Sequence, residues 1–172
     1  MRLALYKGTS LLSRAIQWQT RSEYSHAAFL LSDGSVIEAW QCGGVLHNAH
    51  IGTAHEDGTP VDVFTIKGLT RSMEHDLIGL LTEELGKRYD FAGILGFIDR
   101  VKQPVDDKWF CSELVFAKLE EVGIRLLSRI VAAEVNPGHL RLPTCFMFDE
   151  TLICGEPKPT DDLHRFTALE AQ

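Results

Sequence analysis

Three side chains of this chain could together form a nucleophilic cysteine centre. Cys111 lies in the run Trp-Phe-Cys-Ser-Glu-Leu-Val at 109–115, where an amphipathic helix should begin. His26 lies much earlier, at the start of a predicted strand, and Glu38 closes the hairpin partner of that strand. A thiol at a helix N-terminus, with an imidazole and a carboxylate on a neighbouring sheet, is the arrangement that nucleophilic cysteine catalysis needs.

The chemistry of such a centre assigns a role to each group. A free thiol has a pKa of about 8.5, and a helix N-terminus or a neighbouring imidazolium can lower it by several units. Cys111 has the first feature by position, and its backbone N–H is a candidate oxyanion donor; a second donor is not assigned. Glu38 is suited to orient the imidazole of His26. The alternative is that Cys111 is a small core residue and Glu38 a solvated charge.

The element that positions His26 and Glu38 is a predicted β-hairpin. Its strands cover 24–31 and 35–40, and the segment Ser-Asp-Gly between them ends in Gly34, which suits the left-handed position of a three-residue loop. In that register Ala28 lies opposite Glu38, so His26 and Glu38 share a face as diagonal neighbours about 7–8 Å apart.

A four-residue loop would give the other register. Ala28 would then lie opposite Ala39, and Glu38 would point to the opposite face of the sheet. The glycine at the third loop position favours the three-residue loop, which is the register that we predict.

The remaining pattern predicts an α+β domain over 1–155, followed by a polar tail over 156–172. In the predicted first helix the apolar side consists of Leu11, Ala15, Ile16 and Trp18, and in the cysteine helix it includes Lys118 by its stem. The conformation of 91–101 stays open. The predicted elements are an apolar run at 3–6, a helix from its cap Ser10 to about Thr20, an irregular loop at 41–60, a strand at 61–66, a helix at 72–85 stopped by Gly86, the cysteine helix from 111 to 121 or 122 stopped by Gly123, and one or two strands within 140–153.

Composition narrows the function classes. The chain has 172 residues and a formal net charge of −7, which suits one globular domain and makes nucleic acid an unfavourable partner. The sequence shows no cluster of Lys and Arg for an anionic membrane surface, no clear amphipathic membrane helix, and no apolar run near the roughly 18 residues that span a bilayer. We therefore expect a soluble protein without integral membrane association, cytoplasmic by default because no signal segment is visible.

Cysteine and histidine usage predicts neither a disulfide scaffold nor a metal centre. The four cysteines are irregularly placed and are interpreted as reduced, and no Cys-x-x-Cys pair occurs. His47, His50 and His55 form a loose cluster, but their spacing matches no strong ligand pattern. We expect no metal and no organic cofactor.

The two motifs together resemble a known family. The stretches 24–31 and 36–39, followed much later by 109–115, resemble the circularly permuted NlpC-type, papain-like cysteine peptidases and amidases of the YiiX and YaeF group. In ordinary NlpC-type enzymes the cysteine helix precedes the histidine strand, whereas here His26 comes first, which is the permuted order. The resemblance covers roughly 3–145. This chain departs from the family pattern at Glu113, where glycine is frequent, and at Ala27 and Ala28, where valine and glycine are frequent.

The resemblance implies a fold and a set of roles. It implies a papain-like domain with a small antiparallel sheet packed against the cysteine helix, in which Cys111 is the nucleophile, His26 the general base and Glu38 the residue that orients His26. Tyr89, in the segment 86–90, resembles a tyrosine that lies beside the nucleophile. Two tryptophans near the motifs are candidates to line a substrate cleft: Trp40 and Trp109.

The implied activity is hydrolysis of an amide or peptide bond through a thioester acyl-enzyme. Cell-wall stem peptides, as peptidoglycan fragments, are the leading substrate, reached by a delivery route that the sequence does not reveal. One alternative is a lipid-directed acyltransferase or lipid hydrolase with the same triad, as in the related lecithin-retinol-acyltransferase-like group. Another is a binding module that kept the fold without catalysis.

Overall fold

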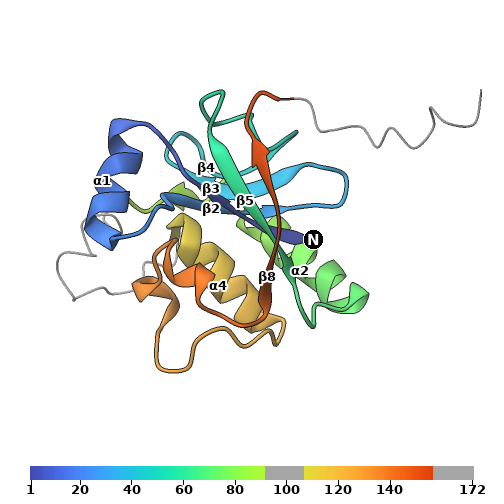
Figure 1. Cartoon of the computed structure of the whole chain (residues 1–172). Helices are drawn as coiled ribbons and strands as arrows, with labels where there is room; N and C mark the ends of the chain where they lie inside the picture. The colour runs from blue at the N-terminus through green and yellow to red at the C-terminus, as the bar shows by residue number, and fades with distance from the viewer. Residues whose placement is uncertain (92–106, 157–172) are drawn as a thin grey trace, which may run out of the picture.

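A computed structural model describes residues 1–91 and 107–156 of the protein. Its centre is a six-stranded antiparallel sheet with the strand order β4-β3-β2-β1-β5-β8, and three helices accompany it within these described ranges (Figure 1). The α+β class is therefore confirmed, with a larger sheet than the sequence suggested. The sheet strands are β1 (Arg2–Tyr6), β2 (His26–Leu30), β3 (Val36–Trp40), β4 (Gly44–Asn48), β5 (Pro60–Ile66) and β8 (Phe146–Ile153).

The helices and the short elements complete the order. The helices are α1 (Leu11–Thr20), α2 (Arg71–Glu84) and α4 (Cys111–Glu121), and two 3-10 turns follow, η1 (Ala132–Glu134) and η2 (His139–Arg141). A two-residue parallel pair, β6 (Arg88–Tyr89) with β7 (Lys108–Trp109), leads into α4. The segment 91–101 and the tail 156–172 lie outside the described residues, apart from positions 91 and 156.

The sheet separates two apolar clusters because successive side chains of a strand point to opposite faces. On one face Leu3 and Leu5 of β1 pack with residues of α2 and α4. On the other face Ala4 and Tyr6 pack with side chains of β2, β3 and β5, under the loop that carries Ile51. β1 is fully buried from Leu3 onward and forms the centre of both clusters.

The β2–β3 hairpin has the predicted register. Leu30 pairs with Val36, the Leu31 N–H donates to the Ser35 carbonyl at 2.9 Å, and Gly34 has φ +89° in the three-residue loop. Glycine fits this position because it adopts a positive φ without steric cost. The register places His26 and Glu38 on one face, as predicted.

Helix α4 begins at Cys111, as predicted. The Glu113 carboxylate accepts from the Phe110 backbone N–H at 3.3 Å, and Gly123, with φ +88°, follows the C-terminus. Its buried side contacts β2 and β3. Lys118 does more than pack its stem: the ammonium of this buried residue lies 2.9 Å from the Glu84 carboxylate and ties α4 to α2.

The orientation of α1 differs from the prediction. Of the four apolar residues assigned to its inner side, only Ile16 is buried, whereas Leu11 is 86% and Trp18 is 84% exposed. Leu12 and Ile16, four residues apart, face the sheet, and Leu11 and Trp18, seven residues apart, face the opposite way. The predicted side combined two opposite faces of the helix.

Two other predictions are corrected or refined. The predicted irregular loop at 41–60 contains β4, which pairs with β3 from Trp40 opposite Gly44 to Val36 opposite Asn48. The segment 140–153 holds one strand, β8, paired with β5. All four cysteines are free in the structure. Within the described ranges, every helix is too short or too polar to cross a bilayer.

Candidate active site

The candidate site forms where β2 and β3 separate. The two strands pair only at Phe29 with Ile37 and Leu30 with Val36, although each is five residues long. If β2 and β3 paired along their full length, the Ala27 N–H would donate to β3, because the odd-numbered residues of β2 point their backbone N–H and C=O groups toward β3. Instead, α4 packs against β2 and β3, and the backbone N–H of Ala27 lies near enough to the Cys111 sulfur to favour its thiolate form.

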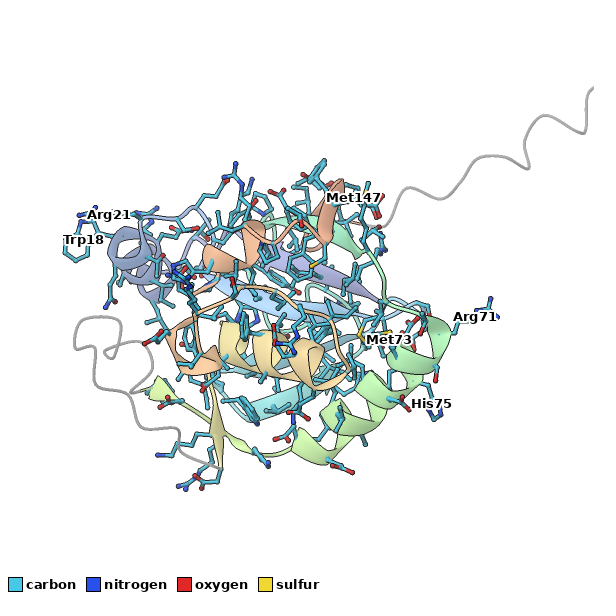
Figure 2. The ribbon with its side chains drawn as sticks, turned by 90° about the horizontal axis from the view of Figure 1, so that it is seen from below. Trp18, Arg21, Arg71, Met73, His75 and Met147 are labelled. Carbon is cyan, nitrogen blue, oxygen red and sulfur yellow. The ribbon has the colours of Figure 1, made fainter. Side chains whose placement is uncertain are left out.

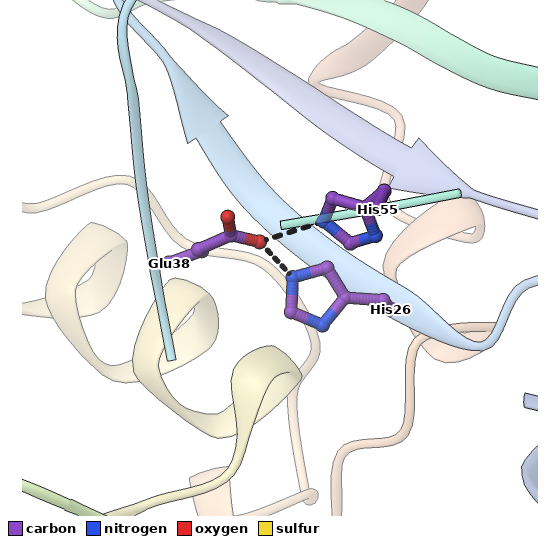
Figure 3. A group of neighbouring side chains, drawn as sticks. All are labelled: His26, Glu38 and His55. Carbon is purple, nitrogen blue, oxygen red and sulfur yellow. Dashed lines mark hydrogen bonds and ion pairs between the residues drawn. The ribbon is translucent and has the colours of Figure 1, made fainter. Parts of the chain in front are cut away.

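His26 and Glu38 meet on the separated strands. The Nε2 atom of His26 lies 2.6 Å from Oε2 of Glu38, and both side chains are buried (Figure 3). This contact agrees with the sequence prediction that Glu38 holds His26. The structure therefore brings two of the three predicted catalytic residues, His26 and Glu38, into contact, and it places the third, Cys111, near the backbone of Ala27, the neighbour of His26.

Glu38 has two further partners that the sequence did not reveal. The Nε2 atom of His55 lies 3.0 Å from the same Oε2 atom, and the Asn48 amide donates to Oε1 at 2.6 Å (Figure 3). Asn48 is a diagonal neighbour of Glu38 across the β3–β4 ladder, so recognition of β4 as a strand would have found it. His55 has no such local signal because it comes from an irregular loop.

The charges in this group follow from its hydrogen bonds. Burial alone would raise the pKa of Glu38, but the hydrogen bonds from His26 and His55 outweigh it and hold that pKa well below its usual range. An ionised carboxylate only accepts, so both imidazoles donate from Nε2. Burial lowers the pKa of His26 more than Glu38 raises it. The ring of His26 is therefore neutral near pH 7, with its lone pair on Nδ1.

Burial favours the protonated form of the Cys111 thiol. Burial raises its pKa to about 12, and the backbone N–H groups of Ala27 and Ser112 offset this only in part. The sequence predicted the opposite direction, from the position of the thiol at a helix N-terminus. The correction arises because the side chain is fully buried, which disfavours the thiolate more than the first turn of α4 favours it.

Aromatic rings enclose the two histidines. The ring of Tyr6 stacks on that of His55, with centroids 3.9 Å apart, and meets the edge of His26 at 5.2 Å. Trp40 contacts the same two imidazoles, at 5.1 Å from His26 and 4.5 Å from His55. These contacts fix both rings in place beside Glu38.

A small crevice opens at His26. The residues that line it come from the β1–α1 connection, α1, β2, the end of β3, the loop with His55, and β6. Two of the three predicted substrate-binding residues, Trp40 and Tyr89, lie on this wall. The third, Trp109, is elsewhere: its indole N–H donates to Glu84, and Lys118 lies over its ring.

The three histidines that lie close in the sequence, His47, His50 and His55, do not share one site in the structure. His47 binds the Ser35 hydroxyl at 2.8 Å, and the His50 backbone N–H binds Thr53, whereas His55 joins the buried group. The ligand-capable atoms of His26, Glu38 and His55 lie within 4.8 Å of one another. Two imidazoles and one carboxylate are donors that zinc accepts in proteins.

Comparisons with known proteins give a likeness of fold. No protein-family model matches the chain. No curated protein sequence matches it either. A solved structure described as the metalloprotein YiiX from Escherichia coli O157:H7 superimposes with a TM-score of 0.63 at 20% sequence identity, over 88% of this chain and 96% of that chain. The protein is therefore similar in fold to YiiX.

Proposed function

We propose that the protein is a cysteine hydrolase that cleaves an amide or peptide bond through a thioester acyl-enzyme. The observation that supports this most is the 2.6 Å contact between His26 and Glu38, together with the nearness of the Cys111 sulfur to the backbone N–H of Ala27, the residue after His26. Nucleophile, base and orienting group thus come from three elements that are distant in the sequence. This is the set that acyl transfer by a thiol requires.

The first half-reaction uses the lone pair of His26. Since the thiol is protonated, Nδ1 of His26 takes its proton while the sulfur attacks the substrate carbonyl and forms a C–S bond. Glu38, which accepts from Nε2–H, stabilises the imidazolium that results. The oxyanion forms near the first turn of α4, where backbone N–H groups have no helical acceptor. Collapse breaks the C–N bond, and His26 returns the proton to the leaving amine.

The second half-reaction releases the acid. A water molecule gives a proton to His26 and adds its oxygen to the thioester carbonyl, after which the C–S bond breaks and the sulfur regains a proton. The net reaction is amide plus water to acid plus amine, without a redox step. Because Cys111 is fully buried, a substrate must displace the groups that cover it to reach the sulfur.

From the family resemblance, we propose that the substrates are cell-wall stem peptides. Tyr89 and Trp40, on the crevice wall, are the residues that we propose to contact the substrate. Incubation of peptidoglycan fragments, lipid acyl donors and peptide amides with native and Cys111→Ser protein, followed by mass spectrometry, tests the class. Products that form only with native protein identify the substrate.

Labelling of the thiol tests catalysis itself. A thiol-reactive, substrate-like probe should label Cys111 in the native protein and not in a His26→Ala variant, with both in a Cys42→Ser background because Cys42 is exposed. Equal labelling of the two proteins would reject the catalytic role of His26. An unreactive Cys111 in folded native protein would favour a binding module instead.

A second candidate function, metal binding, is favoured by the donors of His26, Glu38 and His55. The similar E. coli protein is described as a metalloprotein, and two imidazoles with one carboxylate fit zinc by donor type. A bound zinc ion would supply Lewis-acid chemistry. The same donors also form a complete hydrogen-bonded group, because Glu38 accepts from both imidazoles and from Asn48.

Metal analysis separates the two candidates. If zinc is the functional group, native and Cys111→Ser protein should each hold about one equivalent by elemental analysis, and His55→Gln should hold much less. Hydrolysis would then require zinc and tolerate the loss of the thiol. Hydrolysis that survives chelation and is lost in Cys111→Ser would support the cysteine hydrolase and reject the metal-dependent reading.

A further inference from the structure

The outward face of α1 is apolar and uncovered in the described structure. Leu11 and Trp18 are 86% and 84% exposed, and Ala15 between them is also exposed. Residues at spacings of four and seven share one face of a helix, so the three side chains form a continuous strip. Figure 2 shows Trp18 pointing away from the body of the protein.

Positive charge borders this strip. Arg14 lies three residues after Leu11, and Arg21 three after Trp18, so both flank the same face, and both are exposed. Arg21 follows the C-terminus of α1 and extends to solvent beside Trp18 (Figure 2). Neither arginine has an ion-pair partner among the described residues. Glu23, the nearest acidic residue in the sequence, pairs instead with Lys7 at 3.1 Å.

The local charge contrasts with the whole chain. Residues 1–22 hold four of the 17 Lys and Arg residues and none of the 24 Asp and Glu residues. The rest of the chain therefore carries the entire acidic excess. The arginines beside the strip therefore give this acidic protein one surface that attracts an anionic partner.

The opposite side of α1 belongs to the candidate active site. Ser13 and Ile16 line the crevice at His26, together with Leu12 and Ser10. A helix is about 10 Å across, so the exposed strip and the crevice lie on two sides of one short helix. A partner bound to the strip would lie next to the crevice.

The sequence alone showed no clear amphipathic membrane helix, because the apolar side predicted for this helix combined two opposite faces; the exposed strip is visible only in the structure. We propose that α1 docks the protein on an anionic phospholipid surface. The helix lies in the plane of the interface, Leu11 and Trp18 enter the boundary between headgroups and acyl chains, and Arg14 and Arg21 contact phosphates. Exposed Trp and Leu on one face with Arg at its margin is the composition of interfacial helices, and indole rings favour the headgroup level. The protein binds the membrane without crossing it.

A second copy of this chain fits the strip less well than lipid does. In a two-fold contact each subunit presents the same patch, so the flanking arginines of the two copies would oppose each other. One leucine, one alanine and one tryptophan also offer far less area than the roughly 800 Å² per partner of a stable interface. Anionic headgroups complement the same two charges.

Vesicle sedimentation tests this proposal independently of the proposed function. The protein carries Cys111→Ser, which prevents hydrolysis, and is mixed with vesicles of phosphatidylcholine alone or with phosphatidylglycerol. We expect binding only to the anionic vesicles, and weaker binding as salt rises. Leu11→Ser with Trp18→Ser should abolish it. Arg14→Ala with Arg21→Ala should weaken it about 25-fold, since each basic residue contributes about fivefold near such a surface.

Matched controls come from the other end of the molecule. Phe148 is 60% exposed on the edge strand β8, and Arg71 is exposed on α2 at the end opposite Trp18 (Figure 2). The variants Phe148→Ser and Arg71→Ala should therefore bind vesicles as well as the parent protein does. Absent binding, equal binding to neutral vesicles, or equal loss in the controls would overturn the proposal. Light scattering separates docking on lipid from self-association. If native protein is a dimer, Leu11→Ser/Trp18→Ser protein is a monomer, and native protein does not bind vesicles, the strip serves self-association and the proposal is overturned.

Discussion

His26 Nε2 and Glu38 Oε2 lie 2.6 Å apart on two strands that no longer pair with each other. Helix α4, which begins at Cys111, packs against both of these strands. Because Glu38 holds Nε2–H, the other ring nitrogen of His26 keeps its lone pair and is free to act as a base. The two side chains thus meet where the strands separate, and Glu38 orients the imidazole there.

Glu38→Gln should slow acylation of Cys111 and change the structure of the site little, because glutamine and glutamate have similar shapes. The glutamine oxygen can accept from His26, but the negative charge that stabilises the imidazolium is lost. We expect a fall of about 10²- to 10⁴-fold in the rate at which a substrate-like probe acylates Cys111, measured by mass spectrometry. Asn48→Ala, which removes a neutral donor from the same carboxylate, should cost less than about tenfold. A Glu38→Gln rate equal to the native rate would reject the orienting role.

The resting state should contain a thiol and not a thiolate. Because burial raises the pKa of Cys111 to about 12, its proton should remain bound across the range in which most enzymes work. Titration of thiolate ultraviolet absorbance, as the difference between native and Cys111→Ser protein, should show no step between about pH 5 and pH 9. A step below pH 7 would indicate a preformed ion pair between Cys111 and His26 and contradict this prediction.

Local signals in the sequence were sufficient for the hairpin and for the start of the cysteine helix. Gly34 at the third loop position set the register, and the register put His26 and Glu38 on one face. The run at 109–115 placed Cys111 at a helix N-terminus. Each of these inferences rests on neighbours within a few residues, where turn geometry and helix periodicity decide the structure.

The parts that failed depend on contacts distant in the sequence. His55 comes from a loop whose path is decided by stacking on Tyr6 and bonding to Glu38, and no spacing rule predicts that path. The thiol pKa depends on how completely other segments bury Cys111, which its position in the helix does not reveal. The exposure of Trp18 likewise depends on which face of α1 meets the sheet.

His55 should contribute to stability through the Glu38 carboxylate. His55→Leu removes one hydrogen bond to a buried charge and should lower the free energy of unfolding by about 2 kcal/mol, measured by urea denaturation at neutral pH. His47 is the matched control because it is exposed on β4 and bonds only the Ser35 hydroxyl among the described residues. His47→Leu should change stability by less than about 0.5 kcal/mol. Equal effects of the two substitutions would show that His55 does not support Glu38.

Gly44 should tolerate no side chain where β4 meets the segment before β6. It has φ +78°, and a Cβ there would lie 2.0 Å from the Lys87 carbonyl oxygen, a backbone atom that cannot move aside cheaply. Gly44→Ala should therefore cost about 3 kcal/mol or more in unfolding free energy. Gly58 has a similar φ of +81° with open space around the position, so Gly58→Ala isolates the backbone strain and should cost only about 1–2 kcal/mol. If the two alanine variants unfold at the same urea concentration, the close approach of Lys87 to β4 is not part of the native packing.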